Sequence, residues 1–329
     1  MFDGKKILIT GGTGSLGQAL TAKLLETNVN TIRIFSRDES KQVQMQSGIQ
    51  DKRLRFLIGD IRDFHRLSRA LEGIDIVIHA AALKHVPVAE YNPFEAVKTN
   101  VDGTQNLIEA CLDNNVKMAL AIGTDKAVSP FNTYGATKFL MERLFVSANY
   151  YKGNRDIKFL CVRYGNVLGS SNSIVPIIRK QIVEKKKITI TDPSMTRFTI
   201  TMNEALELIM RALKNGKGGE IFVPKLKAYR LNDMKDAIIE LTNCKNQVEE
   251  MSVRPGEKFH EILINREEFR NTYENEQDFI IHEKQTGGEI KINGTPVDKD
   301  KWKMDYSSEN AELLSKKELK EILIREKFF

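Results

Sequence analysis

The chain has 329 residues, too many for one small core and suited to two lobes, at roughly 100–200 residues per domain. Hydrophobic residues make up 41% and charged residues 29%, a globular composition that excludes a disordered chain. The formal net charge is +6, and without a nucleic-acid-binding motif this excess fits an anionic small molecule better than nucleic acid. No apolar run approaches the ~18 residues of a membrane span, and the apolar run at 7–10 is shorter than that of a signal peptide. We therefore expect a cytoplasmic protein without membrane contact.

Cysteine usage excludes two further classes. The three cysteines, Cys111, Cys161 and Cys244, lie far apart and form no CxxC pair. This pattern favours buried, reduced thiols over a disulfide framework or a zinc site. We therefore expect no metal.

Short apolar runs alternate with helical patterns along the first two thirds of the chain. Strands are predicted at 6–10, 31–35, 54–58, 74–79, 118–123 and 158–163, with helices between them at 16–26, 64–71, 93–114 and 134–151. Such alternation is typical of an α/β protein with a Rossmann-type, doubly wound parallel sheet. Residues 1–165 are expected to form the cofactor domain.

The pattern loosens after residue 165. Helices are predicted at 175–184 and 202–214 and a strand at 220–223, and Ser315 with Glu318 predicts a capping box that opens a last helix at 316–326. We expect residues 166–329 to form mainly a smaller, substrate-binding C-terminal lobe with a polar tail.

A glycine-rich turn joins the first predicted strand to the first predicted helix. Glycines at such a turn let the backbone approach a pyrophosphate, which lies at the helix N-terminus where free N–H groups favour anions. The spacing differs from GxGxxG, but the position between strand and helix favours dinucleotide binding. The residues assigned to this contact are Gly11, Thr13, Gly14, Ser15, Leu16 and Gly17.

The end of the second predicted strand indicates which dinucleotide binds. An NAD site places an acidic residue there to bind the ribose 2′-hydroxyl, whereas this chain has Ser36 and Arg37. A hydroxyl and a guanidinium suit a 2′-phosphate, with Asp38 and Lys41 close by, so we expect NADP. The alternative is a surface Arg37 paired with Asp38 or Glu39.

Further cofactor contacts are expected after the third and fourth predicted strands. Asp60 is placed to meet the adenine amine, and the small side chains of Ala80, Ala81 and Ala82 let backbone pass close to the cofactor. The remaining residues assigned to cofactor binding are Ile61, Lys84, Asn100, Tyr134 and Lys138.

A Tyr-x-x-x-Lys motif opens the helix after the fifth predicted strand. Tyr134 and Lys138 share one helix face, and a nearby ammonium lowers the pKa of a phenol. Tyr134 can then take the proton of a substrate alcohol while hydride leaves for the nicotinamide. Thr124 at the strand end is placed to hydrogen-bond the reacting oxygen, which completes the catalytic set of the short-chain dehydrogenase/reductases.

Asp125 and Lys126 follow Thr124 and place an acid beside a potential base. A simple alcohol dehydrogenase does not need this pair, whereas an enzyme that also eliminates water needs a base at one carbon and an acid at the leaving oxygen. The alternative is an ordinary salt-bridged strand end.

These stretches together resemble the inverting UDP-N-acetylglucosamine 4,6-dehydratases of pseudaminic acid biosynthesis, which are extended short-chain dehydrogenase/reductases. The resemblance runs from Ile7 to about Leu323. It is carried by the glycine turn and by SRDE at 36–39, AAALKHVP at 80–87, TDKA at 124–127, YGATK at 134–138, RYGNV at 163–167, MTRF at 195–198 and RPGEK at 254–258. Retaining dehydratases carry Asp-Glu where this chain has Asp125-Lys126.

The resemblance implies a redox-neutral dehydration. Tyr134 starts oxidation at C4 of the sugar with hydride passing to NADP⁺, Lys126 removes the C5 proton, and Asp125 protonates the departing C6 hydroxyl. Hydride returns to C6 and a proton adds to C5 from the opposite face. The product is UDP-2-acetamido-2,6-dideoxy-β-L-arabino-hex-4-ulose. The resemblance also implies a homo-oligomer.

Polar residues of the second half are expected to hold the substrate, UDP-N-acetylglucosamine. Arg197, Arg254 and Lys258 are candidates for the diphosphate, Asn166 for the uridine or a phosphate, and Lys84 for the sugar pocket, with Val167 and Glu257 beside them. Each has a structural alternative, such as a turn-stabilising Asn, a surface Arg or a Lys whose stem covers apolar surface.

Two other functions remain open. A UDP-sugar 4-epimerase or a retaining 4,6-dehydratase would share the fold, and product analysis at C5 and C6 separates them from an inverting dehydratase. An NADP-binding regulatory or scaffold protein would share the fold but usually loses the catalytic set, which is complete here.

Overall fold

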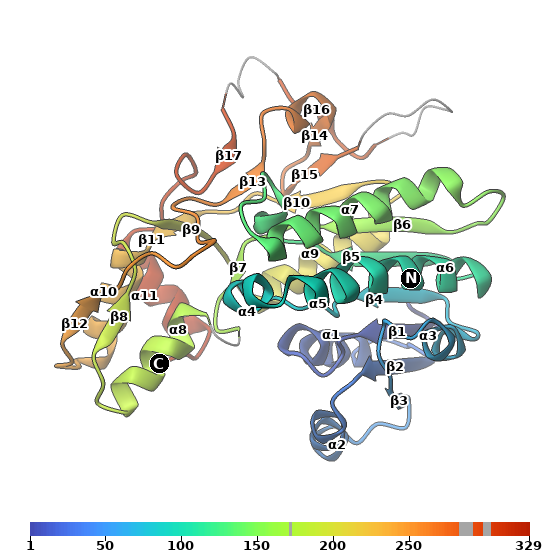
Figure 1. Ribbon diagram of the computed structural model, residues 1–329, viewed down its shortest axis with the longest axis horizontal. Coiled ribbons are helices and arrows are strands. Elements are labelled where there is room, and N and C mark those ends of the chain that lie inside the picture. The colour runs from blue at the N-terminus through green and yellow to red at the C-terminus, as the bar shows by residue number, and fades with distance from the viewer. Residues whose placement is uncertain (171–172, 283–291, 299–303) are drawn as a thin grey trace.

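A large parallel sheet forms the centre of the molecule (Figure 1). The computed structural model describes residues 1–170, 173–282, 292–298 and 304–329. Its first six strands are β1 (Lys6–Thr10), β2 (Thr31–Ser36), β3 (Leu54–Ile58), β4 (Ile76–His79), β5 (Met118–Ile122) and β6 (Lys158–Val162). They pair in parallel in the order β3-β2-β1-β4-β5-β6. This order, which reverses between β1 and β4, is the doubly wound arrangement that the sequence predicts.

Strands from the second half of the chain extend the same sheet. β10 (Ile221–Pro224) pairs in parallel with β6, and β15 (Asp278–Ile281), β14 (Thr272–Glu274) and β16 (Thr295–Pro296) follow in antiparallel pairing. The open edge of β6 would otherwise leave backbone groups unpaired. The expected boundary at residue 165 therefore does not divide the sheet, because the chain returns to it after residue 220.

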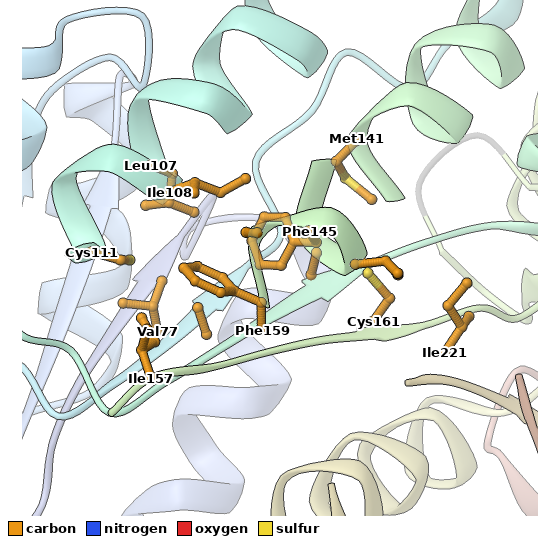
Figure 2. Close-up of a cluster of buried hydrophobic side chains, with 14 of the residues drawn as sticks. Val77, Leu107, Ile108, Cys111, Met141, Phe145, Ile157, Phe159, Cys161 and Ile221 are labelled. Atoms are coloured by element: carbon orange, nitrogen blue, oxygen red, sulfur yellow. The ribbon is translucent and has the colours of Figure 1, made fainter. Parts of the chain in front are cut away.

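Helices cover both faces of the sheet. α3 (Phe64–Leu71), α6 (Gly103–Asp113) and α7 (Thr133–Tyr151) share one buried cluster with the sheet, and α1 (Ser15–Leu25) and α9 (Met202–Asn215) share the other. Figure 2 shows Phe145 and Phe159 together in the first cluster. Their ring centroids lie 5.6 Å apart at 87°, an edge-to-face contact that fixes α7 against β6.

A smaller lobe stands beside the sheet, on the left of Figure 1. Its helices α8 (Ile174–Val183), α10 (Leu231–Thr242) and α11 (Lys316–Arg325) share a separate apolar core. The predicted capping box of Ser315 and Glu318 opens α11 and is confirmed. The short strands of this lobe are β7 (Asn166–Val167), β9 (Thr196–Ile200) and β11 (Ala228–Arg230) in one sheet, and β8 (Ile188–Ile190) with β12 (Val248–Glu250) in another.

The long helix expected at 93–114 is interrupted in the structure. It comprises α5 (Pro93–Val97), a π-helix at Lys98–Asp102 and then α6. Sequence patterns also missed three helices, α2 (Glu39–Gly48), α4 (Val86–Tyr91) and α10. α2 buries only Gln42 and Met45, so it lacks the apolar stripe on which a helix prediction rests.

The remaining short elements are η2 (Asp125–Ala127), η3 (Glu268–Asn271) and the pair β13 (Ile262–Ile264) and β17 (Tyr306–Ser307). Within the described residues, no helix has the length and apolarity to cross a membrane. The same residues contain no group of three His, Cys, Asp or Glu side chains that could hold a metal ion.

Candidate active site

The candidate cofactor residues gather at the carboxyl edge of the parallel strands. Because all six strands point the same way, the turns that follow them meet at one edge, where doubly wound proteins bind nucleotides. The glycine turn follows β1, Arg37 follows β2, Asp60 follows β3, Ala80 to Ala82 follow β4 and Thr124 follows β5.

The glycine turn has the shape that a dinucleotide needs. Gly11 has φ +65°, and a Cβ there would lie 2.9 Å from the Ala81 backbone. A Cβ on Gly17 would lie 2.5 Å from the backbone of Gly12, so Gly17 lets α1 pack closely on the turn. Gly14 is the N-cap of α1, whose first turn has no acidic residue. The residues present therefore fit a diphosphate at this helix N-terminus.

The side chains after β2 form weak, exposed ion pairs. Arg37 is 53% exposed and its guanidinium lies 3.6 Å from Asp60, so it pairs with neither Asp38 nor Glu39. Asp38 caps α2 by accepting from the Lys41 backbone at 3.0 Å, and the Lys41 ammonium lies 3.3 Å from it. Exposed pairs of this kind contribute little, so Arg37 and Lys41 can turn toward a phosphate at small cost.

Asn100 has a structural role that its position in the sequence does not reveal. Its buried amide donates to the Leu83 carbonyl at 3.0 Å and to Thr137 Oγ1 at 3.0 Å, and it accepts from the Leu83 backbone N–H at 2.8 Å. It thereby fixes the turn after β4 against α7. Ile61 is buried, whereas Lys84 is exposed.

Tyr134 is buried at the start of α7, next to Thr124 and Lys126. Asn132 caps this helix by accepting from Gly135 at 2.7 Å. Burial raises the pKa of Tyr134 to about 12, against the charge of Lys126 and a hydrogen bond with Thr124, which lower it. The phenol therefore needs further positive charge to act as a base at neutral pH, which an oxidised nicotinamide would add.

Lys138 makes hydrogen bonds in this structure that do not involve the Tyr134 phenol. Its ammonium donates to the Ile122 carbonyl at 2.6 Å and contacts Met141 Sδ at 2.8 Å. Burial lowers the pKa of Lys138 to about 8. Lys138 was expected to lower the pKa of the Tyr134 phenol, whereas in this structure the neighbouring cation that lowers it is Lys126.

Lys126 is the centre of a buried polar network. Its Nζ lies 3.1 Å from Asp125 Oδ1, 2.9 Å from Glu261 Oε1 and 3.3 Å from Asn166 Oδ1. Thr124 Oγ1 donates to the same Asp125 oxygen at 2.9 Å. Asp125, Lys126 and Asn166 are expected in the site from the sequence, whereas Glu261 is not. Its only signal in the sequence is that it comes just after the RPGEK stretch.

The predicted substrate residues divide into two groups. Arg197 is buried and its guanidinium lies 3.0 Å from Glu257, with further hydrogen bonds to the carbonyls of Thr196 and Phe259. The Lys258 ammonium donates to the Val128 carbonyl at 2.7 Å. These side chains fasten the RPGEK loop and are already bonded to protein.

Arg254 belongs to the second group, because its side chain is exposed. It lines a cleft of about 890 Å³ together with Glu257, Lys258 and Phe131. Val167 lies on β7, directly after Asn166, and pairs with Ile200 of β9. The cleft lies beside the RPGEK loop.

A Rossmann-type sheet with this glycine turn and a Thr–Tyr–Lys set defines the class of short-chain dehydrogenase/reductases. Within it, the sequence profile of the polysaccharide biosynthesis protein family matches residues 7–283. The chain belongs to this family.

Two curated relatives match nearly the whole chain. The inverting UDP-N-acetylglucosamine 4,6-dehydratase of Campylobacter jejuni serotype O:2 is 45% identical, over 98% of this chain and 98% of the relative. The UDP-glucose 4-epimerase of Rickettsia rickettsii is 37% identical, over 98% and 96%. The dehydratase is thus the more similar of the two.

Solved structures agree with this assignment. Pen from Bacillus thuringiensis superposes with a TM-score of 0.94 at 41% identity and covers both chains completely. The UDP-glucuronic acid 4-epimerase of Bacillus cereus, in complex with UDP-glucuronic acid and NAD, has a TM-score of 0.70 at 25% identity and covers 77% of this chain and 88% of its own.

Proposed function

We propose that this protein is an inverting UDP-N-acetylglucosamine 4,6-dehydratase. The observation that carries the proposal is the contact between Asp125 and Lys126, 3.1 Å apart, next to Tyr134. An epimerase needs to oxidise and reduce only C4, whereas an acid beside a base serves elimination. The 45% identity to a dehydratase of this name supports the same reading.

The residues divide the reaction between them. Tyr134 takes the proton of the C4 hydroxyl, and Thr124 hydrogen-bonds the reacting oxygen. A nicotinamide dinucleotide held at the glycine turn would supply the hydride acceptor for C4 and the hydride donor for C6. Once C4 is a ketone the C5 proton is acidic, and Lys126 removes it while Asp125 protonates the departing C6 hydroxyl. A proton adds to C5 from the opposite face, so the product is the UDP-linked β-L-arabino-hex-4-ulose.

We further propose the parts that surround this chemistry. Residues 1–165, completed by β10 and β14–β16, bind the cofactor, and the smaller lobe with the RPGEK loop binds the UDP part of the substrate. Arg254 is the side chain most available to a diphosphate, because it is exposed in the cleft. A homo-oligomer, measurable by light scattering, remains a prediction.

The decisive assay is incubation with UDP-N-acetylglucosamine in D₂O, followed by NMR of the product. An inverting dehydratase puts deuterium at C5, removes the C6 hydroxyl and inverts C5. A retaining dehydratase would keep the C5 configuration. A 4-epimerase would leave the C5 proton and the C6 hydroxyl in place, and that result would end the proposal.

We predict that the protein prefers NADP(H). Arg37 is exposed and only weakly paired. Arg37→Ala should therefore lower the affinity for NADP by 10-fold or more, because a hydrogen bond to a charged group contributes ~1.5–3 kcal/mol. The affinity for NAD should change little. Titration calorimetry of both cofactors on both proteins measures this. Equal affinities in the wild type would show that Ser36 and Arg37 do not read the 2′-phosphate.

We also predict that turnover is redox-neutral. Hydride leaves C4 and returns at C6, so product should form with catalytic cofactor and without accumulation of NADPH. Absorbance of reduced nicotinamide, recorded beside product formation, tests this. A rise matched one to one with product would indicate a plain dehydrogenase.

A further inference from the structure

Glu261 is a buried carboxylate for which the proposed reaction has no role. It precedes β13, is 2% exposed, and its Oε1 lies 2.9 Å from Lys126 Nζ. Asp125, which is 1% exposed, contacts the same ammonium at 3.1 Å. Two buried carboxylates therefore share one ammonium.

Each of these two carboxylates has one oxygen without a hydrogen-bond partner among the described residues. Asp125 Oδ1 accepts from Thr124 and Lys126, and Glu261 Oε1 contacts Lys126. Asp125 Oδ2 and Glu261 Oε2 are buried without a hydrogen-bond partner among the described residues. An ionised carboxylate is expensive to bury in this way, and two that share a site do not both ionise readily. One of the two therefore carries a proton.

The surroundings decide which carboxyl carries the proton. Burial and the charge of Glu261 raise the pKa of Asp125, against the charge of Lys126. The charges of Lys126 and Arg197 lower the pKa of Glu261 despite its burial. The two pKa values therefore move in opposite directions, so Asp125 is the carboxyl that holds a proton more readily and Glu261 the one that ionises more readily.

The other charged and titratable groups around the pair do not reverse this order. Arg197 is paired with Glu257 at 3.0 Å, and Lys258 donates to the Val128 carbonyl. The phenols of Tyr134 and Tyr229 are neutral at physiological pH, because burial raises the pKa of each to about 12.

We infer that Glu261 is a positioning residue of the dehydration step, which supplies the lasting negative charge beside Lys126 so that Asp125 keeps a proton for the C6 hydroxyl. This inference rests on the proposed dehydratase function. The resting Lys126 ammonium, whose side chain is 20% exposed, first loses a proton to solvent. Neutral Lys126 then takes the C5 proton and becomes an ammonium paired with Glu261, and Asp125 gives its proton to the hydroxyl, which leaves as water. Because Lys126 and Asp125 are in contact, the proton on Lys126 can return to Asp125, and Glu261 stays ionised throughout.

Glu261→Gln removes the charge but keeps the shape and an acceptor oxygen. Asp125 then becomes the sole counter-ion of Lys126 and ionises, so dehydration at neutral pH should fall about 10²-fold, the lower end of a general acid's contribution. Exchange of the C5 proton in D₂O needs Lys126 but not the Asp125 proton, so it should fall much less. Loss of both in equal measure would mean a structural role and would overturn the inference.

The pH dependence gives a second, independent readout. Burial and the charge of Glu261 both raise the pKa of Asp125. Burial lowers the pKa of Lys126, but the charges of Asp125 and Glu261 outweigh it and raise that pKa. Removing the charge lowers both pKa values, so the pH–rate profile of dehydration should move to lower pH. Glu261→Asp keeps the charge and should leave the profile in place. Glu220→Gln is the matched control, because Glu220 is also buried but accepts from Lys217 and Gly218 at the opposite edge of the sheet.

An infrared measurement tests the inference without turnover. At neutral pH the wild-type enzyme should have a protonated-carboxyl band that Asp125→Asn removes, and Glu261→Gln should remove it too because Asp125 ionises. If Glu261→Gln does not fold, the difference spectrum between wild type and Asp125→Asn still tests whether Asp125 is protonated. Absence of the protonated-carboxyl band from that spectrum overturns the inference. Failure of the wild type to dehydrate UDP-N-acetylglucosamine would instead contradict the proposed function, so the two failures are distinguishable.

Discussion

Tyr134→Phe should stop the reaction before hydride leaves C4. The ring still fills its buried position at the start of α7, so binding of cofactor and substrate should survive. Without the phenol nothing takes the proton of the C4 hydroxyl, and turnover should fall by at least the ~10²–10⁴-fold that general acid–base groups contribute. A single-turnover experiment should then show no reduced nicotinamide, no C5 exchange and no product.

A control on the same helix separates chemistry from folding. Tyr151→Phe removes a hydroxyl at the other end of α7, where the side chain is half exposed, and should leave turnover unchanged. If Tyr134→Phe still forms reduced nicotinamide at the wild-type rate, another group takes the C4 proton and the assignment of Tyr134 is wrong.

The cofactor half of the molecule is predictable from the sequence because its signals are local. Each strand of the parallel sheet is a short apolar run, and the turn after it contains the candidate cofactor residues. Gly11 illustrates this, since its φ of +65° and its approach to Ala81 follow from one turn between one strand and one helix. Likewise, β2 ends at Ser36 and Arg37 is the next residue, so both candidate contacts to a 2′-phosphate come from one strand end.

The substrate half is less predictable because its contacts join distant segments. Glu261 reaches Lys126, and Arg197 reaches Glu257, only after the chain has folded. No spacing in the sequence encodes such contacts. The same limit explains why the boundary expected at residue 165 does not divide the sheet, since nothing in the apolar run of β10 indicates that it pairs with β6. It also explains Lys138, whose hydrogen bond to Ile122 depends on how α7 packs on β5.

Lys126→Ala should retain the first half-reaction and lose the second. Tyr134, Thr124 and Lys138 remain, so the enzyme should bind UDP-N-acetylglucosamine and still pass hydride from C4, although more slowly because Lys126 also lowers the pKa of Tyr134. Exchange of the C5 proton and dehydration should both fall by at least ~10²–10⁴-fold, as expected for loss of a general base. Deuterium incorporation at C5, followed beside reduced nicotinamide and product, measures the three steps separately.

The alanine change also leaves Asp125 and Glu261 without the ammonium that both contact, so a loss of activity could reflect the broken ion pair instead of the missing base. Lys126→Arg resolves this, because a guanidinium keeps the positive charge between the two carboxylates but does not deprotonate in proteins. If Lys126 is the base, the arginine variant should restore stability toward the wild-type melting temperature while C5 exchange stays as low as in the alanine variant. Recovery of exchange by arginine would reduce Lys126 to a salt-bridge partner. Dehydration by Lys126→Ala at near the wild-type rate would contradict the assignment of Lys126 as the C5 base and the inverting mechanism built on it.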